Sequence, residues 1–298
     1  MTGKADLHVH SKYSGLSKIL FVKYPDSISE PRDILRNAEQ RGLDVVCITD
    51  HNSIRGAMEA RKIESPVEVV VGEEISTADG EVLGLFLTEE VPRGMTAAET
   101  IDAIHTMGGL AVAPHPFSTH CSALGNMVFD LDLDGIEMLN SVHRDGYSDD
   151  IAQRLCTDSG RALTGGSDAH TPTMVGNAYT TFEGHTAEDL RKSLFDRTTG
   201  YGGGYTTLRD IVWMTTNIAL KLHLTVTKAI FNSTRQEDVE YAKEIYAMRP
   251  LTKVLALVGT TAIMAPSSLF LVSVIGNYIH KSRSRTRWVE IIKQGRKL

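Results

Sequence analysis

The sequence predicts an α/β fold: a barrel of the TIM type, regular or distorted, with seven or eight strand–helix units and a helical, apolar C-terminal extension. Short β-rich runs alternate with helical stretches through the first 200 residues. Several of these runs end in His, Asp or Glu, and an apolar run without charges lies close to the C-terminus. Alternating strands and helices are typical of a mostly parallel sheet.

The expected elements follow from residue pattern. Strands are predicted at 5–10, 44–49, 67–75, 81–87, 110–116, 135–140, 161–168 and 177–182. Helices are predicted at 30–42, 96–109, 148–160 and 186–195. Pro31 and Gly42 mark the ends of the first helix, and the other three open with Ser or Thr followed by acidic residues, as helix N-termini prefer.

The two parts of the chain differ in charge. Residues 201–298 contain 14 Lys and Arg against 6 Asp and Glu, whereas residues 1–200 contain 17 against 31. The glycine-rich stretch 198–207 predicts a linker, so we expect one domain at 1–200 and a second region at 201–298. The acidic residues 1–200 favour the binding of cations, and the basic residues 201–298 favour contact with phosphates or with an anionic membrane surface.

The cysteines and the N-terminus indicate the cellular compartment in which the protein is found. Cys47, Cys121 and Cys156 are scattered without a CxxC pattern, which argues against a disulfide framework and favours a reducing environment. The N-terminus lacks the apolar stretch of a signal peptide, so we expect a cytoplasmic protein.

The stretch ADLHVH at the start of the chain is a candidate metal site. In an extended strand Asp6, His8 and His10 share one face, while Leu7 and Val9 share the other. Neutral imidazoles bind Zn, Mn or Fe well. On its own, this pair fits hydrogen-bonded surface histidines equally well.

Four further strands end in residues that bind metals: Asp50–His51, Glu73–Glu74, His115 and Asp168–His170. The carboxyl ends of barrel strands meet at one face, where the active sites of such barrels form. These residues together with His8 and His10 predict a metal site there.

Five motifs in this order, DLHVHS, ITDHN, GEEIS, APHP and GGSDAH, resemble the PHP (polymerase and histidinol phosphatase) superfamily over residues 4–182. The resemblance implies a distorted (βα)7 barrel that holds two or three Zn, Mn or Fe ions and hydrolyses phosphoesters. By motif, one ion would be held by His8, His10, Glu74 and Asp168. Glu74 would bridge to a second ion, which His115 also binds, and His51 and His170 would hold a third. Glu73 is then expected at the surface or behind the ligands.

Two positions depart from the family pattern. Gly15 stands where many members have an acid or a histidine, so we expect the third ion to lack that ligand. Glu81 stands near the place of another family histidine; as an oxygen ligand it would favour Mn over Zn.

The residues expected to act on the phosphoryl group are Asp168 and His170, with Arg144 as a cation for the phosphate. A solvated loop arginine is the alternative for Arg144, and His143 is a weaker candidate as proton donor or ligand. Asp6 and Asp50 would either orient ligand imidazoles or cap strand ends. Paired ions activate water as the nucleophile and neutralise the phosphoryl oxygens.

The C-terminal region adds a second hypothesis. Residues 254–279 carry no charge and are long enough to cross a bilayer, but Pro266 near their middle fits a hairpin that dips into one leaflet. With the helix-like stretch 211–231 and the basic tail, this predicts contact of residues 211–298 with the inner face of the cell membrane. A buried helical hairpin is the alternative.

The leading functional hypothesis is a metal-dependent phosphoesterase acting on a small phosphomonoester or a nucleotide. The first alternative is a nuclease or phosphodiesterase on short oligonucleotides, aided by the basic tail, although no nucleic-acid motif is visible. The second is a non-catalytic module that binds metal or nucleotide, which Gly15 alone favours.

Overall fold

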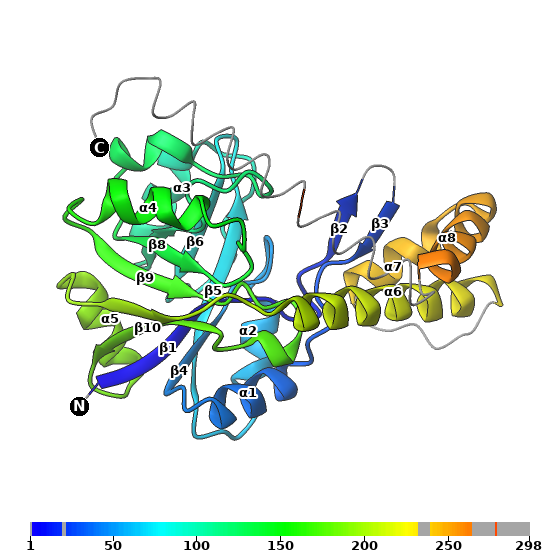
Figure 1. Cartoon of the computed structure of the whole chain (residues 1–298), viewed down its shortest axis with the longest axis horizontal. Coiled ribbons are helices and arrows are strands. Elements are labelled where there is room, and N and C mark those ends of the chain that lie inside the picture. Colours follow the sequence, from blue (N-terminus) through cyan, green and yellow to red (C-terminus); the bar gives the residue numbers. More distant parts are fainter. Residues whose placement is uncertain (1, 20–21, 232–238, 264–277, 279–298) are drawn as a thin grey trace.

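In the computed structural model, which describes residues 2–19, 22–231, 239–263 and 278, nine strands form a sheet that curls into a nearly closed barrel (Figure 1). In pairing order they are β11 (Gly200–Gly203), β10 (Ala178–Glu183), β1 (Thr2–Val9), β4 (Val45–Ile48), β5 (Glu68–Ser76), β6 (Glu81–Leu85), β7 (Leu110–Ala113), β8 (Gly135–Asn140) and β9 (Ala162–Gly166). Thr180 links β10 to β9, because its Oγ1 accepts from Gly165 N at 3.0 Å and donates to Gly165 O at 2.9 Å. The predicted α/β barrel is confirmed.

The barrel is distorted by antiparallel strands: β10 is antiparallel to β1, and β6 is a second case. Strands β1, β4 and β5 are parallel, as are β7, β8 and β9, but β6 is antiparallel to both β5 and β7. No helix separates β5 from β6, and Ser76 pairs with Glu81. Glu81 at the start of β6 therefore lies at the same edge as the end of β5.

The helices around the barrel are α1 (Pro31–Gln40), α2 (Arg55–Ala60), α3 (Ala97–Thr106), α4 (Ser148–Cys156) and α5 (Ala187–Phe195). Two of them open with a capping box, in which the side chain of Thr96 or Thr186 accepts from the backbone of Glu99 or Asp189. The four expected helices are confirmed. The short helix α2 was not expected.

Strand β4 shows how the core is divided. Val46 and Ile48 belong to the apolar cluster that includes Ile34 of α1, whereas Val45 and Cys47 belong to the cluster that includes Leu190 of α5. Alternate residues of a strand point to opposite faces, so both faces of the sheet are buried.

The stretch 198–207 is not simply the linker that its glycines predict, because it contains β11, which pairs antiparallel with β10. Close approach requires a glycine at position 203: Gly203 has a φ of +104°, and a Cβ atom there would lie 2.2 Å from Asn177 O. The sheet therefore continues past residue 200, and the division into two domains there stays a prediction.

Beyond the barrel lie the strands β2 (Leu16–Ile19) and β3 (Val22–Pro25), which pair with each other, and the helices α6 (Leu208–Ile230), α7 (Glu240–Ala247) and α8 (Pro250–Ile263) (Figure 1). The predicted helical extension is confirmed, and α6 packs on α7 and α8. Within the described part of the chain, no helix has the length and apolar character needed to cross a bilayer. The predicted hairpin 254–279 begins in α8, but from residue 264 on, apart from Tyr278, it lies outside the described residues, as does the basic tail.

Candidate metal centre

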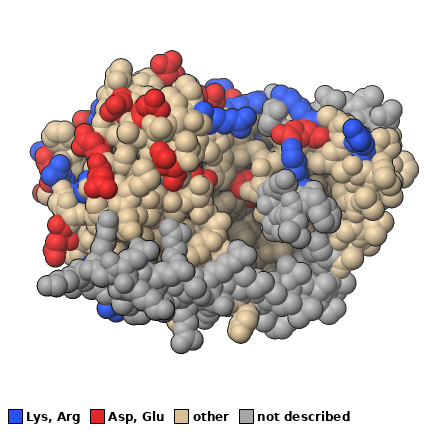
Figure 2. Space-filling model, turned by 90° about the horizontal axis from the view of Figure 1, so that it is seen from above, with Lys and Arg blue, Asp and Glu red and all other residues tan. Residues whose placement is uncertain are grey.

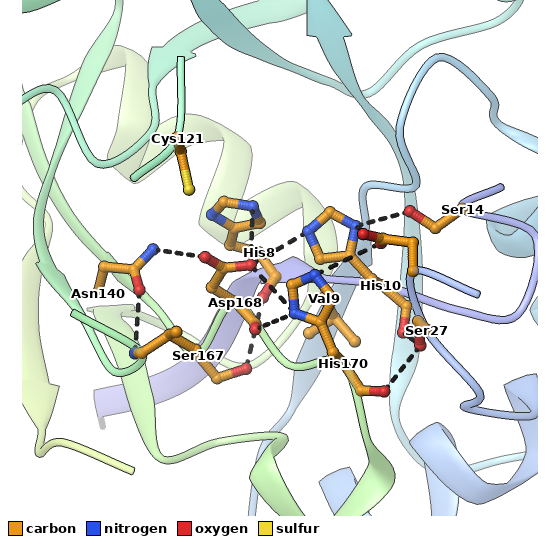
Figure 3. A network of polar contacts seen from close by, with 12 residues as sticks. His8, Val9, His10, Ser14, Ser27, Cys121, Asn140, Ser167, Asp168 and His170 are labelled. Atoms are coloured by element: carbon orange, nitrogen blue, oxygen red, sulfur yellow. Dashed lines mark hydrogen bonds and ion pairs between the residues drawn. The ribbon is translucent and has the colours of Figure 1, made fainter. Parts of the chain in front are cut away.

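The eight residues predicted as metal ligands come together in one buried site at the ends of the strands. His8 lies in β1 and His10 directly after it, Glu74 lies in β5, and Glu81 opens β6. His51 follows β4, His115 follows β7, and both Asp168 and His170 follow β9. Figure 3 shows the side chains of His8, His10, Asp168 and His170 converging from these elements.

Two histidines and two carboxylates form the centre of the site. His10 Nε2 lies 3.3 Å from Glu74 Oε2 and 3.2 Å from Asp168 Oδ1. His8 Nε2 lies 3.4 Å and 3.6 Å from the same two oxygens. The Nε2 atoms of both histidines are buried and make no hydrogen bond to the described residues. These orphaned nitrogens, aimed at carboxylate oxygens, fit a divalent cation.

The two carboxylate oxygens of Glu74 contact different histidines. Its Oε1 lies 3.1 Å from His115 Nε2, whereas its Oε2 lies 3.2 Å from His51 Nδ1. Glu81 is within 4 Å of the same two histidines, at 3.9 Å from His115 Nε2 and 3.8 Å from His51 Nδ1. A carboxylate with a different partner at each oxygen suits a bridge between two ions.

A third set of ligands contains Asp26, which the sequence analysis missed. One donor atom from each of His10, Asp26, His51 and His170 lies within 4.8 Å of the others. His170 Nε2 is 3.4 Å from Asp26 Oδ2, and the buried Oδ2 makes no hydrogen bond among the described residues. His170 Nδ1 donates to the carbonyl of Asp168 at 2.8 Å, which turns Nε2 towards Asp26.

Asp26 is a candidate for the ligand that was expected to be missing at Gly15. Strands β2 and β3 run out and back between the two residues, and Asp26 N donates to Gly15 O at 3.1 Å. Asp26 therefore follows Gly15 by eleven positions in the sequence but lies beside it in space. An acid directly after an antiparallel strand pair would have been the signal, but that pair was not predicted.

Glu137 and Asn140 of β8 form a layer behind the ligands that sequence reasoning also missed. His8 Nδ1 donates to Glu137 Oε1 at 3.2 Å, and Glu137 Oε2 accepts from His115 N at 2.7 Å. Asn140 Nδ2 donates to Glu137 Oε2 at 3.0 Å and to Asp168 Oδ2 at 3.2 Å. Such contacts fix the orientation of the ligands, and with Nδ1 of His8 engaged its Nε2 is left for an ion.

Gly166 allows this layer to pack closely. A Cβ atom there would lie 2.5 Å from both Glu137 Oε1 and the Cβ of His8. The second glycine of GGSDAH is therefore required by the contact between a ligand and its supporting carboxylate.

The carboxylates of Asp6 and Asp50 accept hydrogen bonds from backbone N–H groups rather than from imidazoles. Asp6 accepts hydrogen bonds from Ser167 N at 2.9 Å and Gly176 N at 2.7 Å, and Asp50 accepts from both the backbone and the hydroxyl of Ser11. Of the two roles expected for them, the geometry fits capping of the strand ends.

Two ligands have unusual backbone conformations. His115 has a φ of +26° and Asp168 a φ of +51°, a region that non-glycine residues seldom adopt. Such conformations persist where the surrounding structure imposes them, and they cluster at functional sites. Each residue lies two positions after the end of a barrel strand, His115 after β7 and Asp168 after β9.

The other candidates lie in different surroundings. Glu73, expected at the surface or behind the ligands, is fully buried and accepts a hydrogen bond from Val91 N at 2.9 Å. His143 is buried, with its ring 5.3 Å from that of His115 and its Nε2 3.1 Å from Ser118 Oγ. Arg144 beside it is partly buried, and its role stays a prediction.

Charges within the site set the protonation of its ligands. Burial alone would raise the pKa of Asp168, but His8, His10 and His170 hold it well below its usual range. Burial, together with the charge of His170, lowers the pKa of His10 to about 4. Both groups are therefore in the form that binds a metal ion at neutral pH.

Other candidate ligands, among them His115 and His170, hold protons when no ion is bound. Burial would lower the pKa of His115, but the hydrogen bond and charge of Glu74 raise it to about 9. Despite burial, Asp26 and Asp168 raise the pKa of His170 to about 10. An ion must displace these protons in order to bind.

Comparisons with known proteins identify the family of the chain. Residues 146–199 match the family PHP_C, described as PHP-associated. An uncharacterized protein of Methanocaldococcus jannaschii is 56% identical over 151 residues, which cover 50% of this chain and 88% of the relative. The chain belongs to the PHP superfamily.

Two solved structures share the fold. One is a two-domain protein from Bacteroides vulgatus that contains a predicted PHP-like metal-dependent phosphoesterase. It has a TM-score of 0.56 and 20% identity, and the likeness covers 68% of this chain and 65% of that one. The other is endonuclease Q in complex with a 27-mer duplex carrying an abasic lesion, with a TM-score of 0.50 and 16% identity over 99% of this chain and 93% of that one.

We expect metal binding at neutral pH to release protons, and the affinity to rise with pH up to the pKa values of about 9 and 10 of His115 and His170. The sign follows because these histidines are protonated in the metal-free chain and neutral when they bind an ion. Calorimetric titration with MnCl2 in buffers of different ionisation enthalpy measures the proton release. Binding heats that do not depend on the buffer would contradict it.

Asp26→Ala should weaken the binding of one ion by about 10- to 100-fold or more and leave the others in place, because Asp26 belongs to only one ligand set. Metal content per chain after equilibration in dilute Mn²⁺ measures this. The matched control is Asp33→Ala on α1, whose carboxylate pairs with Arg36 away from the site. Equal metal content in the Asp26 and Asp33 variants would exclude Asp26 as a ligand.

Proposed function

We propose that this protein is a metal-dependent phosphoesterase that hydrolyses a small phosphomonoester or a nucleotide. The observation that carries the proposal is the arrangement of overlapping ligand sets around Glu74 and His10. Ligand sets that share residues would hold ions close together, as hydrolysis of phosphoesters requires.

The number and kind of ions belong to the proposal. The sets consist of imidazole nitrogens and carboxylate oxygens, which suit Mn, Zn or Fe. Glu81 adds an oxygen donor within 4 Å of His51 and His115, which tilts the preference towards Mn. We propose that two or three divalent ions bind, with His10, Asp26, His51 and His170 holding the third.

When bound, such ions activate water as a nucleophile and neutralise charge on the phosphoryl group. The residues of the chain would do the rest. Asp168, held ionised by its histidine neighbours and fixed by Asn140, would hold an ion through its carboxylate. His170 donates a hydrogen bond from Nδ1 to a backbone carbonyl, so its Nε2 would be the atom that binds an ion.

Cations near the site support the binding of a phosphate. The guanidinium carbon of Arg55 lies 4.6 Å from the ring centroid of Tyr13, and Lys12 Nζ lies 5.2 Å from it. Lys12 follows His10 by two positions in the chain, and Arg55 follows His51 by four. Figure 2 shows a hollow between the barrel and the extension with Lys and Arg atoms along its upper rim. We propose that Arg55 and Lys12, with Arg144 from the sequence analysis, attract the substrate.

A second candidate function is a nuclease or phosphodiesterase. It is supported by the likeness to endonuclease Q, which covers almost the whole chain, extension included. A basic C-terminal region would add affinity for a polyanion, and such affinity falls steeply with salt. The third hypothesis, a non-catalytic module, would lose its only support if Asp26 supplies the ligand that Gly15 lacks.

Contact with a membrane surface also stays a prediction. Its support within the described residues is a set of exposed apolar side chains on α6 and α8: Trp213, Leu220, Leu224, Leu251, Val254, Leu255 and Val258.

Hydrolysis of a panel of phosphomonoesters, nucleotides and short oligonucleotides with Mn²⁺ tests the proposal. We expect turnover by the wild type and a loss of about 10³-fold or more in Asp168→Asn, because a missing ligand charge removes several kcal/mol of transition-state stabilisation. Asp132→Asn, which alters an exposed acid, is the matched control and should match the wild type.

The panel also separates the candidates. Turnover of oligonucleotides alone, falling steeply between low and physiological salt, would select the nuclease. Tight metal binding with no turnover on any substrate would overturn the phosphoesterase proposal and favour the non-catalytic module.

A further inference from the structure

The helices of the extension pack on the part of the chain that carries Asp26. One apolar cluster contains seven buried residues from α6 and from the α7 segment: Leu222, Val226, Ala229, Val239, Tyr241, Ala242 and Ile245. Three side chains from the other end of the sequence pack against this cluster: Tyr13, Leu16 and Tyr24. Leu16 opens β2, Tyr24 lies in β3, and Figure 1 shows both strands beside α6 and α7.

Apolar packing dominates this contact. An ion pair between Lys23 Nζ and Glu244 Oε2, at 2.6 Å, also joins β3 to α7. Both side chains are more than 40% exposed, and exposed pairs contribute little to stability. Burial of Val226, Tyr241 and their neighbours therefore supplies most of the attachment.

The β2–β3 pair needs such support. It forms a sheet of its own, separate from the barrel sheet, among the residues that the structure describes. An isolated pair of strands is marginally stable in water and becomes stable when it packs on a helix. Helix α6 contacts β3 directly.

The supported segment is connected to the third ligand set at both of its ends. Before β2, Ser14 Oγ is hydrogen-bonded to His10 Nδ1 and accepts from His51 N, each at 3.1 Å. After β3 comes Asp26, whose carboxylate accepts from Ser17 of β2. The position of Asp26 therefore depends on the position of the strand pair.

We propose that α6 and α7 are a positioning element for the third metal ion. By packing on Tyr13, Leu16 and Tyr24 they hold the strand pair before Asp26 so that Asp26 faces His10, His51 and His170. The proposal rests on the proposed metal site and gives the extension a role within it. Val226 and Tyr24 act as positioning residues, since neither belongs to a ligand set. The ions held by Glu74, His8 and His115 do not depend on the extension.

The test compares Val226→Asp with Leu224→Asp. Both place a carboxylate on α6, but Val226 is fully buried in the contact whereas Leu224 is 48% exposed. Metal per chain is measured by mass spectrometry after dialysis against dilute Mn²⁺, with far-UV circular dichroism as a check on folding. We expect Val226→Asp to lose about one ion per chain, and Leu224→Asp and the conservative Val226→Ile to retain the wild-type number.

Each outcome decides between the claims. A wild type that binds no ion would refute the metal site itself, whereas a wild type that holds only two would refute this inference and leave the metal site standing. Wild-type metal content in Val226→Asp would also overturn the inference. If Val226→Asp does not fold, Val226→Ala, which only opens a cavity, must weaken the most loosely held ion at least several-fold relative to Leu224→Ala, and an unchanged affinity would overturn the proposal.

Discussion

The site depends on the compensation of buried negative charge at Glu74 and Asp168. Both carboxylates are nearly inaccessible, and the pKa of each lies well below its usual range, because histidine charges outweigh the effect of burial. Facing them, His8 and His10 present Nε2 atoms that make no hydrogen bond within the described part of the chain. Buried charges and unpaired polar atoms each cost free energy, so the site requires compensating positive charge, which protonated histidines supply in the metal-free chain and cations would supply when bound. The ligand positions, the layer behind them and the loop that carries Asp26 all serve that requirement.

The barrel meets this requirement by bringing the ends of its strands to one place. Antiparallel β6 departs from the regular pattern, and through this departure Glu81 reaches the edge where β5 ends. β8 contributes no ligand of its own, yet its Glu137 and Asn140 hold His8, His115 and Asp168. The extension adds a third structural contribution, since it packs on the strands that precede Asp26.

Much of this site could be predicted from the sequence, because ligands at strand ends follow recognisable runs of apolar residues. Parallel strands of a barrel end at one face, so His51, His115 and Asp168 could be placed together without any coordinates. Asp26 could not, because its place depends on the pairing of two short strands that return the chain to Gly15, and pairing is a long-range property. Glu137 looked like an ordinary residue in the middle of a strand, and only the neighbouring strands reveal what it contacts. The glycines of 198–207 predicted flexibility, although they also permit the close approach of β11 to β10.

The most direct test of the account is X-ray diffraction from crystals grown with Mn²⁺, with anomalous scattering recorded to locate the ions. The account predicts ions on both sides of Glu74, one contacted by each of its carboxylate oxygens, and a further ion between Asp26 and His170. Anomalous density at the surface alone, with Glu74 still hydrogen-bonded to His115 and no ion between them, would contradict it.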